Sequence, residues 1–267
     1  MISVTTAQWY AWIAAFAWPF FRILGLIISE PILGNANIPS TTKVGLAVFL
    51  TLVLAPVLPP MPTVDPASAA GVFIAFQQLL IGLAIGFTLR VALTAAETAG
   101  QLIGLQMGLG FAVFFDPQSS AQTAVMGQFV GMFAMLTFLA MDGHLMVVTA
   151  LSRSFTTLPI SLQPLASGGL LTMARSGGEI FSTGLLISLP VVTALLIANI
   201  AVGIMTRAAP QLNIFAVGFP ITLAVGFFGF WLAIPFMGPA IQNMFEQALI
   251  ATMRVAEQFA SIPLPAR

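Results

Sequence analysis

The chain contains 267 residues, of which 59% are apolar, 6% are charged and none is cysteine. Eight lysines and arginines balance eight aspartates and glutamates, and the mean hydropathy is +1.04. A soluble domain carries about 25% charged residues, so these few charges could not cover the surface of a soluble globule of this size. The composition excludes an ordinary cytosolic enzyme, a nucleic-acid binder held by a basic patch and a disordered chain. It indicates a membrane protein.

Residues suited to catalysis are scarce. The absence of cysteine removes disulfides, thiol chemistry and cysteine-based metal sites. The one histidine, His144, leaves no histidine pair for a metal or a catalytic triad. His144 follows an apolar run, where it either bonds to backbone at the membrane boundary or relays a proton. No nucleophile motif, phosphate-binding loop or carboxylate pair accompanies it, so we expect no enzyme, no cofactor and no metal site.

Six segments are long and apolar enough to cross a membrane, which takes about 20 mainly apolar residues. They are Trp9–Ser29, Val44–Val64, Pro66–Leu89, Pro117–Met141, Ile180–Thr206 and Ala208–Phe245. The first charged residue is Arg22, so the N-terminus lacks the basic region of a cleavable signal peptide and the first segment is expected to remain in the mature chain. A seventh stretch, Thr98–Phe115, carries two glutamines and four glycines. It predicts a helix packed inside protein.

Proline marks most of the connections between these segments. Prolines bracket a turn-rich loop over Glu30–Lys43 and fill a second connection over Pro56–Pro66. Other prolines fall inside or beside apolar runs, which predicts kinked or broken helices. The longest stretch with loop character is Ser152–Gly178, rich in serine, threonine and glycine. The predicted fold class is therefore all-α and membrane-associated, with about six long, partly kinked apolar helices plus shorter ones.

Glycines recur at four-residue spacing along the apolar segments. The series are Gly82/Gly86, Gly100/Gly104/Gly108 and Gly127/Gly131. Residues four apart share one face of a helix, so each series makes a flat groove that another backbone can approach closely. Packing of helices within one chain explains any single pair. The three consecutive glycines favour tight packing between helices or between subunits.

Three ionisable residues, Arg22, Arg90 and Glu97, stand inside apolar segments or between them. Such groups are costly in a membrane and usually face protein, water or a partner. We interpret them as structural ion pairs that set the register of an assembly. The alternative is a proton or ion relay in a transporter.

The segment Gln106–Pro117 combines a permissive backbone with bulky apolar rings. Its candidate gate residues are Gly108, Gly110, Phe111, Phe114, Phe115, Asp116 and Pro117. Glycine allows the backbone to rearrange and proline ends any helix. A hydrophobic constriction can gate a pore by excluding water. The segment is therefore either a pore plug or a buried loop anchored by its aromatic side chains.

Several motifs together resemble one protein family. They are Pro31–Asn35 with Ile38-Pro39, Gln106–Pro117, Asp142-Gly143-His144, Ser154–Pro159 and Arg207–Pro220. In this order they resemble the FliR family of flagellar biosynthetic proteins, and they span essentially the whole chain. The last motif is long and specific, which makes a chance match improbable.

The resemblance implies a subunit of the flagellar type III protein export gate in the bacterial inner membrane, at the flagellar basal body. FliP-like and FliQ-like subunits, a FlhB-like export switch protein, membrane lipid and exported unfolded flagellar proteins would be its partners. Residues 1–175 would be a FliP-like helical part and 176–267 a FliQ-like hairpin with a C-terminal tail, within one continuous unit. Gln106–Gln122 would correspond to the pore-closing plug loop of the family.

Two other functions remain to be weighed. The equivalent subunit of a virulence injectisome shares the family fold, and neighbouring genes for needle or flagellar proteins would distinguish the two. A secondary transporter for a small solute would carry an inverted repeat and paired intramembrane charges. We find neither in the sequence.

Overall fold

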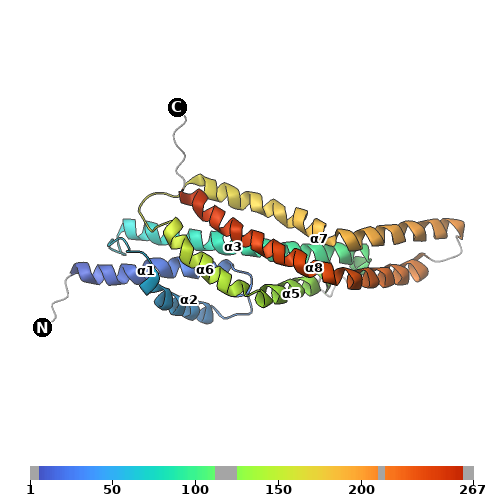
Figure 1. Cartoon of the computed structure of the whole chain (residues 1–267), viewed down its shortest axis with the longest axis horizontal. Helices are drawn as coiled ribbons and strands as arrows, with labels where there is room; N and C mark the ends of the chain where they lie inside the picture. The colour runs from blue at the N-terminus through green and yellow to red at the C-terminus, as the bar shows by residue number, and fades with distance from the viewer. Residues whose placement is uncertain (1–5, 112–124, 210–213, 261–267) are drawn as a thin grey trace, which may run out of the picture. The chain divides into compact units, whose positions relative to one another are not determined.

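Every regular element in the described parts of the chain, residues 6–111, 125–209 and 214–260 of a computed structural model, is a helix (Figure 1). In chain order they are α1 (Thr6–Ser29), α2 (Ser40–Leu54), the 3-10 helix η1 (Ala55–Val57), α3 (Ala69–Gln106), the 3-10 helix η2 (Leu109–Phe111), α5 (Val125–Ala140), α6 (Gly143–Thr157), α7 (Ser167–Ala208) and α8 (Ile214–Ala260). The predicted all-α class is confirmed.

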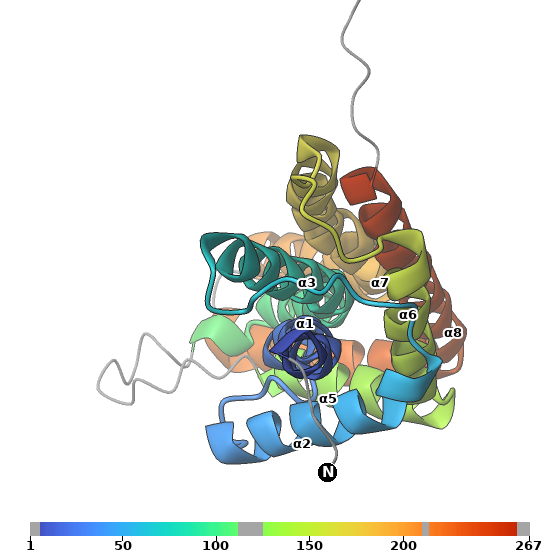
Figure 2. The ribbon, with the colours of Figure 1, turned by 90° about the vertical axis from the view of Figure 1, so that its left-hand side faces the viewer.

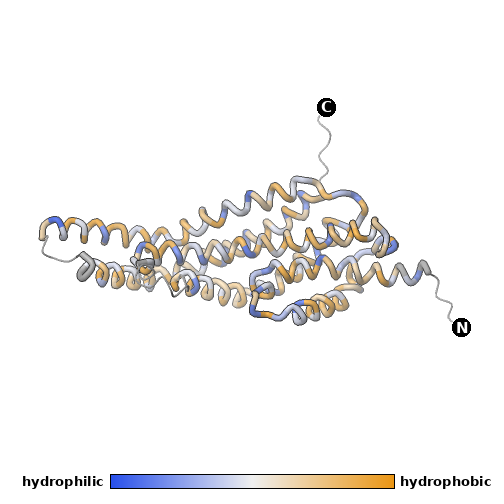
Figure 3. The backbone as a smooth tube through the Cα atoms, turned by 180° about the vertical axis from the view of Figure 1, so that it is seen from behind, coloured by the Kyte–Doolittle hydropathy of each residue, from blue (hydrophilic) through white to orange (hydrophobic). Residues whose placement is uncertain are grey.

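Five candidate spans are long and apolar enough to cross a membrane: α1, α2 continued by η1, α3, α7 and α8. The pair α5 and α6 adds a sixth candidate if it forms one broken span, with a bend of 68° between the two helices. Figure 3 shows hydrophobic residues along most of the length of each long helix. The expected number of long apolar helices is therefore confirmed as five to six.

The predicted break within residues 66–115 is absent from the structure, because the hydropathy of a segment and the continuity of its helix are separate properties. The sequence predicted two segments, Pro66–Leu89 and Thr98–Phe115, on either side of Arg90 and Glu97. The structure has a single helix, α3, running through both charged residues. Arginine and glutamate are good helix formers, and no proline or glycine stands between residues 90 and 100. The charges interrupt the apolar run and leave the helix intact.

A second difference concerns the predicted loop Ser152–Gly178. The helix α6 continues through Thr157 and α7 begins at Ser167, so only 158–166 connects them. Hydroxyl side chains in these turns bond back to the helix: Ser154 Oγ donates to the carbonyl of Leu151 at 2.6 Å, and Thr172 Oγ1 to that of Gly168 at 2.9 Å. Serine and threonine can therefore stay helical when their hydroxyls are satisfied locally.

The chain forms two compact units. Unit 1 comprises Met1–Val91, Asp142–Gly177 and Glu246–Arg267, and unit 2 comprises Ala92–Met141 and Gly178–Phe245. Each of α3, α7 and α8 contributes residues to both. The expected division at residues 175 and 176 rests on family resemblance and stays a prediction.

The helices α7 and α8 run antiparallel to each other. In unit 1, a Cβ on Gly168 would lie 2.8 Å from Oε1 of Gln258. In unit 2, a Cβ on Gly229 would lie 3.9 Å from that of Ala194. The start of α7 thus contacts the end of α8, and a later part of α7 contacts an earlier part of α8, as in a helical hairpin.

Unit 1 is organised around a close crossing of α1 and α3. Figure 2 shows α1 end-on, with α3 on one side and α2 on the other. A Cβ on Gly82 would meet the backbone carbonyl of Arg22 and lie 2.8 Å from the backbone nitrogen of Leu26. On the other helix, a Cβ on Gly25 would lie 3.0 Å from the nitrogen of Leu83. The two backbones can approach this closely only because both positions are glycine.

Replacing Gly82 by alanine is expected to destabilise the protein, because the neighbouring atoms belong to backbone that cannot turn aside. Overpacking of this kind typically costs about 1–3 kcal/mol. Gly45→Ala on α2 is the matched control, since a Cβ there meets nothing within 4 Å. Alanine is up to about 1 kcal/mol more favourable than glycine in a helix, so the control should melt at or above the wild-type temperature. Equal melting of both variants in detergent would contradict the crossing.

Candidate functional site

Arg22 lies in the second half of α1 and is fully buried, with 0% of its surface exposed. Its Nε donates a hydrogen bond to Oε1 of Gln78 on α3 at 2.8 Å. Its Nη1 donates to the carbonyl of Ser154 and its Nη2 to that of Leu158, both at 2.9 Å. The guanidinium carbon stands 4.2 Å from the centre of the Phe155 ring. One side chain therefore joins α1, α3 and the end of α6.

The structural ion pair proposed for Arg22 stays a prediction, and the hydrogen bonds of this residue show a different kind of partner. Within the described ranges, each hydrogen bond of its guanidinium goes to a neutral oxygen. The carbonyls of Ser154 and Leu158 belong to the C-terminal end of α6, which carries the negative end of the helix dipole. This end compensates the buried charge. Because Arg22 is enclosed, a role in holding the helices fits better than a relay open to water.

The other two predicted charges belong to different units. Arg90, in unit 1, is exposed, and its charge acts on the carboxyl of Glu30. Glu97, in unit 2, lies partly buried across from α5, where a Cβ on Gly131 would come within 2.7 Å of its Cγ. The proposed register-setting role of both residues stays a prediction.

Glu30 is a buried acid that sequence reasoning passed over. Only 4% of its surface is exposed, and its Oε2 accepts hydrogen bonds from the N–H groups of Ile32 at 3.0 Å and Leu33 at 2.6 Å. Burial raises the pKa of Glu30, while these two bonds and the charge of Arg90 offset part of the rise. The signal in the sequence was an acid followed directly by proline at the end of an apolar helix. It marks the turn that ends α1.

The start of the candidate gate segment is anchored within unit 2. After α3 ends, Met107 is fully buried and Gly108 adopts a φ of 83°, a conformation that glycine favours. Thr222 Oγ1 on α8 donates to the carbonyl of Met107 at 3.3 Å. A Cβ on Gly226 would lie 2.5 Å from Cγ of Met107, so that glycine makes room for the side chain. The chain thus turns out of α3 at a fixed point.

The remaining gate residues are only partly within the described ranges. Leu109–Phe111 form η2, which includes Gly110. Phe114, Phe115, Asp116 and Pro117 lie outside the described residues. The predicted plug itself therefore stays a prediction, and the geometry concerns its starting turn.

The predicted glycine faces contact the chain's own helices. Gly86 meets α1, where a Cβ would lie 2.8 Å from the nitrogen of Glu30. A Cβ on Gly100 would lie 2.8 Å from the Cα of Gly127, and one on Gly104 would lie 3.3 Å from Cβ of Met126. Gly108 does not continue this face, because its positive φ places it after the helix. Contacts of these glycines with another subunit stay a prediction.

Comparison with known proteins finds relatives along nearly the whole chain. Residues 13–248 match the family described as bacterial export proteins, family 1. Over 261 residues the chain is 42% identical to the flagellar biosynthetic protein FliR of Pectobacterium carotovorum subsp. carotovorum, covering 98% of this chain and 100% of that protein. Identity to FliR of Escherichia coli K12 is 42% over 247 residues, covering 92% and 94%. Identity to FliR of Bacillus subtilis 168 is 30% over 244 residues, covering 90% and 93%.

Replacing Arg22 by methionine should destabilise unit 1, because methionine fills similar space and donates no hydrogen bond. The carbonyl of Leu158 would lose its charged donor, at roughly 1–3 kcal/mol for a buried unsatisfied group, whereas that of Ser154 would keep the backbone N–H of Leu158. Amide hydrogen exchange at the end of α6 should accelerate, and the melting temperature in detergent should fall. The control is Arg175→Met at an exposed position of α7. If both variants melt alike, the buried network does not hold the helices.

The buried Glu30 predicts a pH dependence of stability. Because the folded chain binds this proton more tightly than the unfolded chain, stability is highest below the ordinary pKa of 4.5 and falls as pH rises through the raised value. Glu30→Gln keeps an oxygen for the N–H groups of Ile32 and Leu33 and does not titrate. The wild type should therefore lose melting temperature relative to this variant as pH is raised from 4 to 7. A difference independent of pH would contradict the prediction.

Proposed function

Because this chain belongs to family 1 of the bacterial export proteins, we propose that it is a subunit of the flagellar protein export gate. The observation that carries the proposal is 42% identity to a flagellar biosynthetic protein FliR over the full length of that relative. In this role the chain helps to form and close a channel through which unfolded flagellar proteins leave the cell.

The gate segment supplies the closing element in this proposal. Met107, held by α8, and the turn at Gly108 give the segment a fixed base. The rings of Phe111, Phe114 and Phe115 then supply bulk and a dry constriction. Asp116-Pro117 anchors its far end, since proline fixes its own φ and biases the preceding residue away from helix. A plug of this kind excludes small ions while the gate is at rest.

Large apolar side chains on the outside of the helices support a role inside an assembly. Phe181 on α7 is 73% exposed and Phe236 on α8 is 76% exposed. Many other large apolar side chains are exposed as well, and a soluble protein rarely leaves so much apolar surface in contact with water. FliP-like and FliQ-like subunits, a FlhB-like protein and membrane lipid cover these surfaces in our proposal. The setting is the bacterial inner membrane at the flagellar basal body. The antiparallel α7 and α8 are the part that resembles a FliQ-like hairpin.

In our proposal the chain is a component of a passage and not a catalyst, as its family assignment suggests. In the described ranges, no three histidine, aspartate or glutamate side chains gather where they could hold a metal ion. In this proposal the subunit forms a passage, and the energy for export comes from elsewhere. The relatives named above are flagellar proteins, which favours the flagellar gate over the equivalent injectisome subunit.

Changing Phe111, Phe114 and Phe115 together to alanine should leave an assembled gate that leaks small ions, because the constriction loses its bulk. The assay is ion conductance of membranes carrying the complex, with complex yield measured on the same preparation. Phe181→Ala, which removes an exposed ring of α7, controls for the loss of aromatic surface.

Two results would end the plug hypothesis. One is an assembled complex with all three alanines that stays tightly sealed. The other is loss of the complex itself, which would make the rings core anchors, since truncating a buried phenylalanine typically costs about 3–5 kcal/mol. The export-gate assignment itself is tested separately. A strain that lacks the gene should regain secretion of flagellar proteins when the wild-type gene is returned to it.

A further inference from the structure

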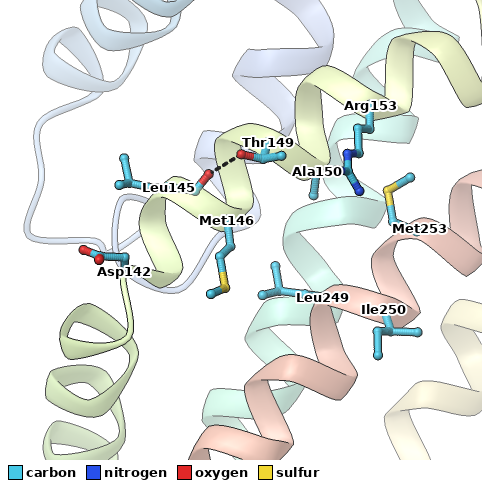
Figure 4. A pocket seen from close by; sticks show the side chains of 9 residues that line it. All are labelled: Asp142, Leu145, Met146, Thr149, Ala150, Arg153, Leu249, Ile250 and Met253. Atoms are coloured by element: carbon cyan, nitrogen blue, oxygen red, sulfur yellow. Dashed lines mark hydrogen bonds between the residues drawn. The ribbon is translucent and has the colours of Figure 1, made fainter.

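A groove of about 390 Å³ runs between α6 and the last part of α8, within unit 1 (Figure 4). Its walls are mostly apolar: Leu145, Met146, Thr149 and Ala150 come from α6, and Leu249, Ile250 and Met253 from α8. Volumes of about 300–1,000 Å³ are typical of ligand sites in proteins. Leu145 and Ile250 are more than half exposed, so the groove leaves apolar surface uncovered in this chain.

The two ends of the groove carry opposite charges. Arg153 lines one end and Asp142 the other, and Figure 4 shows the two side chains separated along α6. Among the residues that the structure describes, the guanidinium of Arg153 forms no hydrogen bond or ion pair. Asp142 forms no side-chain cap on α6. An occupant with an apolar body and one anionic end would therefore be attracted at Arg153 and repelled at Asp142.

The length of the groove matches one leaflet of a membrane. Arg153 lies eleven positions after Asp142, and at about 1.5 Å per position the distance along α6 is roughly 16 Å. The hydrocarbon core of a bilayer is about 30 Å thick, so one leaflet supplies chains of about half that length. An acyl chain can thus lie along the groove from one charged end to the other.

We propose that this groove binds one anionic phospholipid, with an acyl chain between α6 and α8 and the phosphate at Arg153. A guanidinium offers paired N–H donors that match phosphate oxygens. Met146 and Met253 provide flexible side chains that adapt to a chain of variable shape. The charge of Asp142 sets the direction, because it repels a headgroup from the opposite end.

A helix of a partner protein fits this groove less well. A helix about 10 Å across and 16 Å long occupies roughly 1,200 Å³, which exceeds the empty volume of about 810 Å³ in and around the groove. A single acyl chain is thinner than a helix and needs no matching side chains. The inference is independent of the export function, since lipid contact is measured without any export.

The test uses the purified full-length chain, with any proteins that co-purify, in nanodiscs of phosphatidylcholine. Trace phosphatidylglycerol carrying a photoreactive acyl chain is added, and the labelled peptides are identified by mass spectrometry. We expect labelling of α6 and the end of α8, with phosphatidylglycerol preferred over an equivalent phosphatidylcholine probe. Arg153→Gln should lower labelling by the phosphatidylglycerol probe about fivefold, because that is the gain in affinity that one arginine typically provides near an anionic headgroup. Arg175→Gln, at an exposed position outside the groove, should match the wild type.

A second variant tests the apolar part. Ala150→Phe fills the groove and should reduce labelling by both probes, while complex yield reports folding. Equal labelling by the two probes in the wild type, or equal loss in Arg153→Gln and Arg175→Gln, would overturn the proposal. A photoreactive residue in place of Met146 should react with lipid. Its reaction with a neighbouring polypeptide would show a protein occupant and would also overturn the proposal.

Discussion

A guanidinium removed from water determines how three helices of unit 1 meet. Burying a charge costs several kcal/mol unless hydrogen bonds and an opposite charge compensate it. Arg22 forms its hydrogen bonds with neutral groups, namely the amide of Gln78 and carbonyl oxygens at the end of α6. The partial negative charge of that helix end takes the place of an opposite full charge. The donors of a guanidinium have a fixed planar geometry, so these acceptors must stay in place. The glycine crossing of α1 and α3 brings Arg22 close enough to reach them.

Buried polar groups of this chain are hydrogen-bonded, whereas much of its exposed surface is apolar. Inside unit 1, polar groups such as Thr88 and Thr252 are paired, with their hydroxyls 2.7 Å apart. Outside, aromatic and aliphatic side chains are left exposed along α1, α7 and α8. A chain with 6% charged residues cannot hold this surface in water. This exposed apolar surface is the reason we propose that lipid and partner subunits cover the chain, in keeping with its place among bacterial export proteins.

Local features were predictable from the sequence and distant partners were not. The end of α1 at Ser29 follows from Glu30-Pro31, and the glycine spacing identified faces suited to close packing. The acceptors of Arg22 lie 56 to 136 residues away along the chain, and no spacing rule reaches that far. The continuity of α3 was missed because hydropathy responds to charge, whereas a helix depends on backbone geometry. The helical residues within Ser152–Gly178 were missed because a composition rich in serine and threonine does not indicate that their hydroxyls bond to carbonyls of their own helices.

The central claim is that this chain is one component of an export gate whose other subunits cover its apolar helices. The most direct measurement is to isolate the tagged chain from membranes in mild detergent and determine the composition and mass of the complex. The account predicts stable co-isolation with FliP-like and FliQ-like proteins in a fixed stoichiometry, and an aggregation-prone chain when it is expressed alone. A stable, monodisperse single chain that recovers neither partner would contradict it.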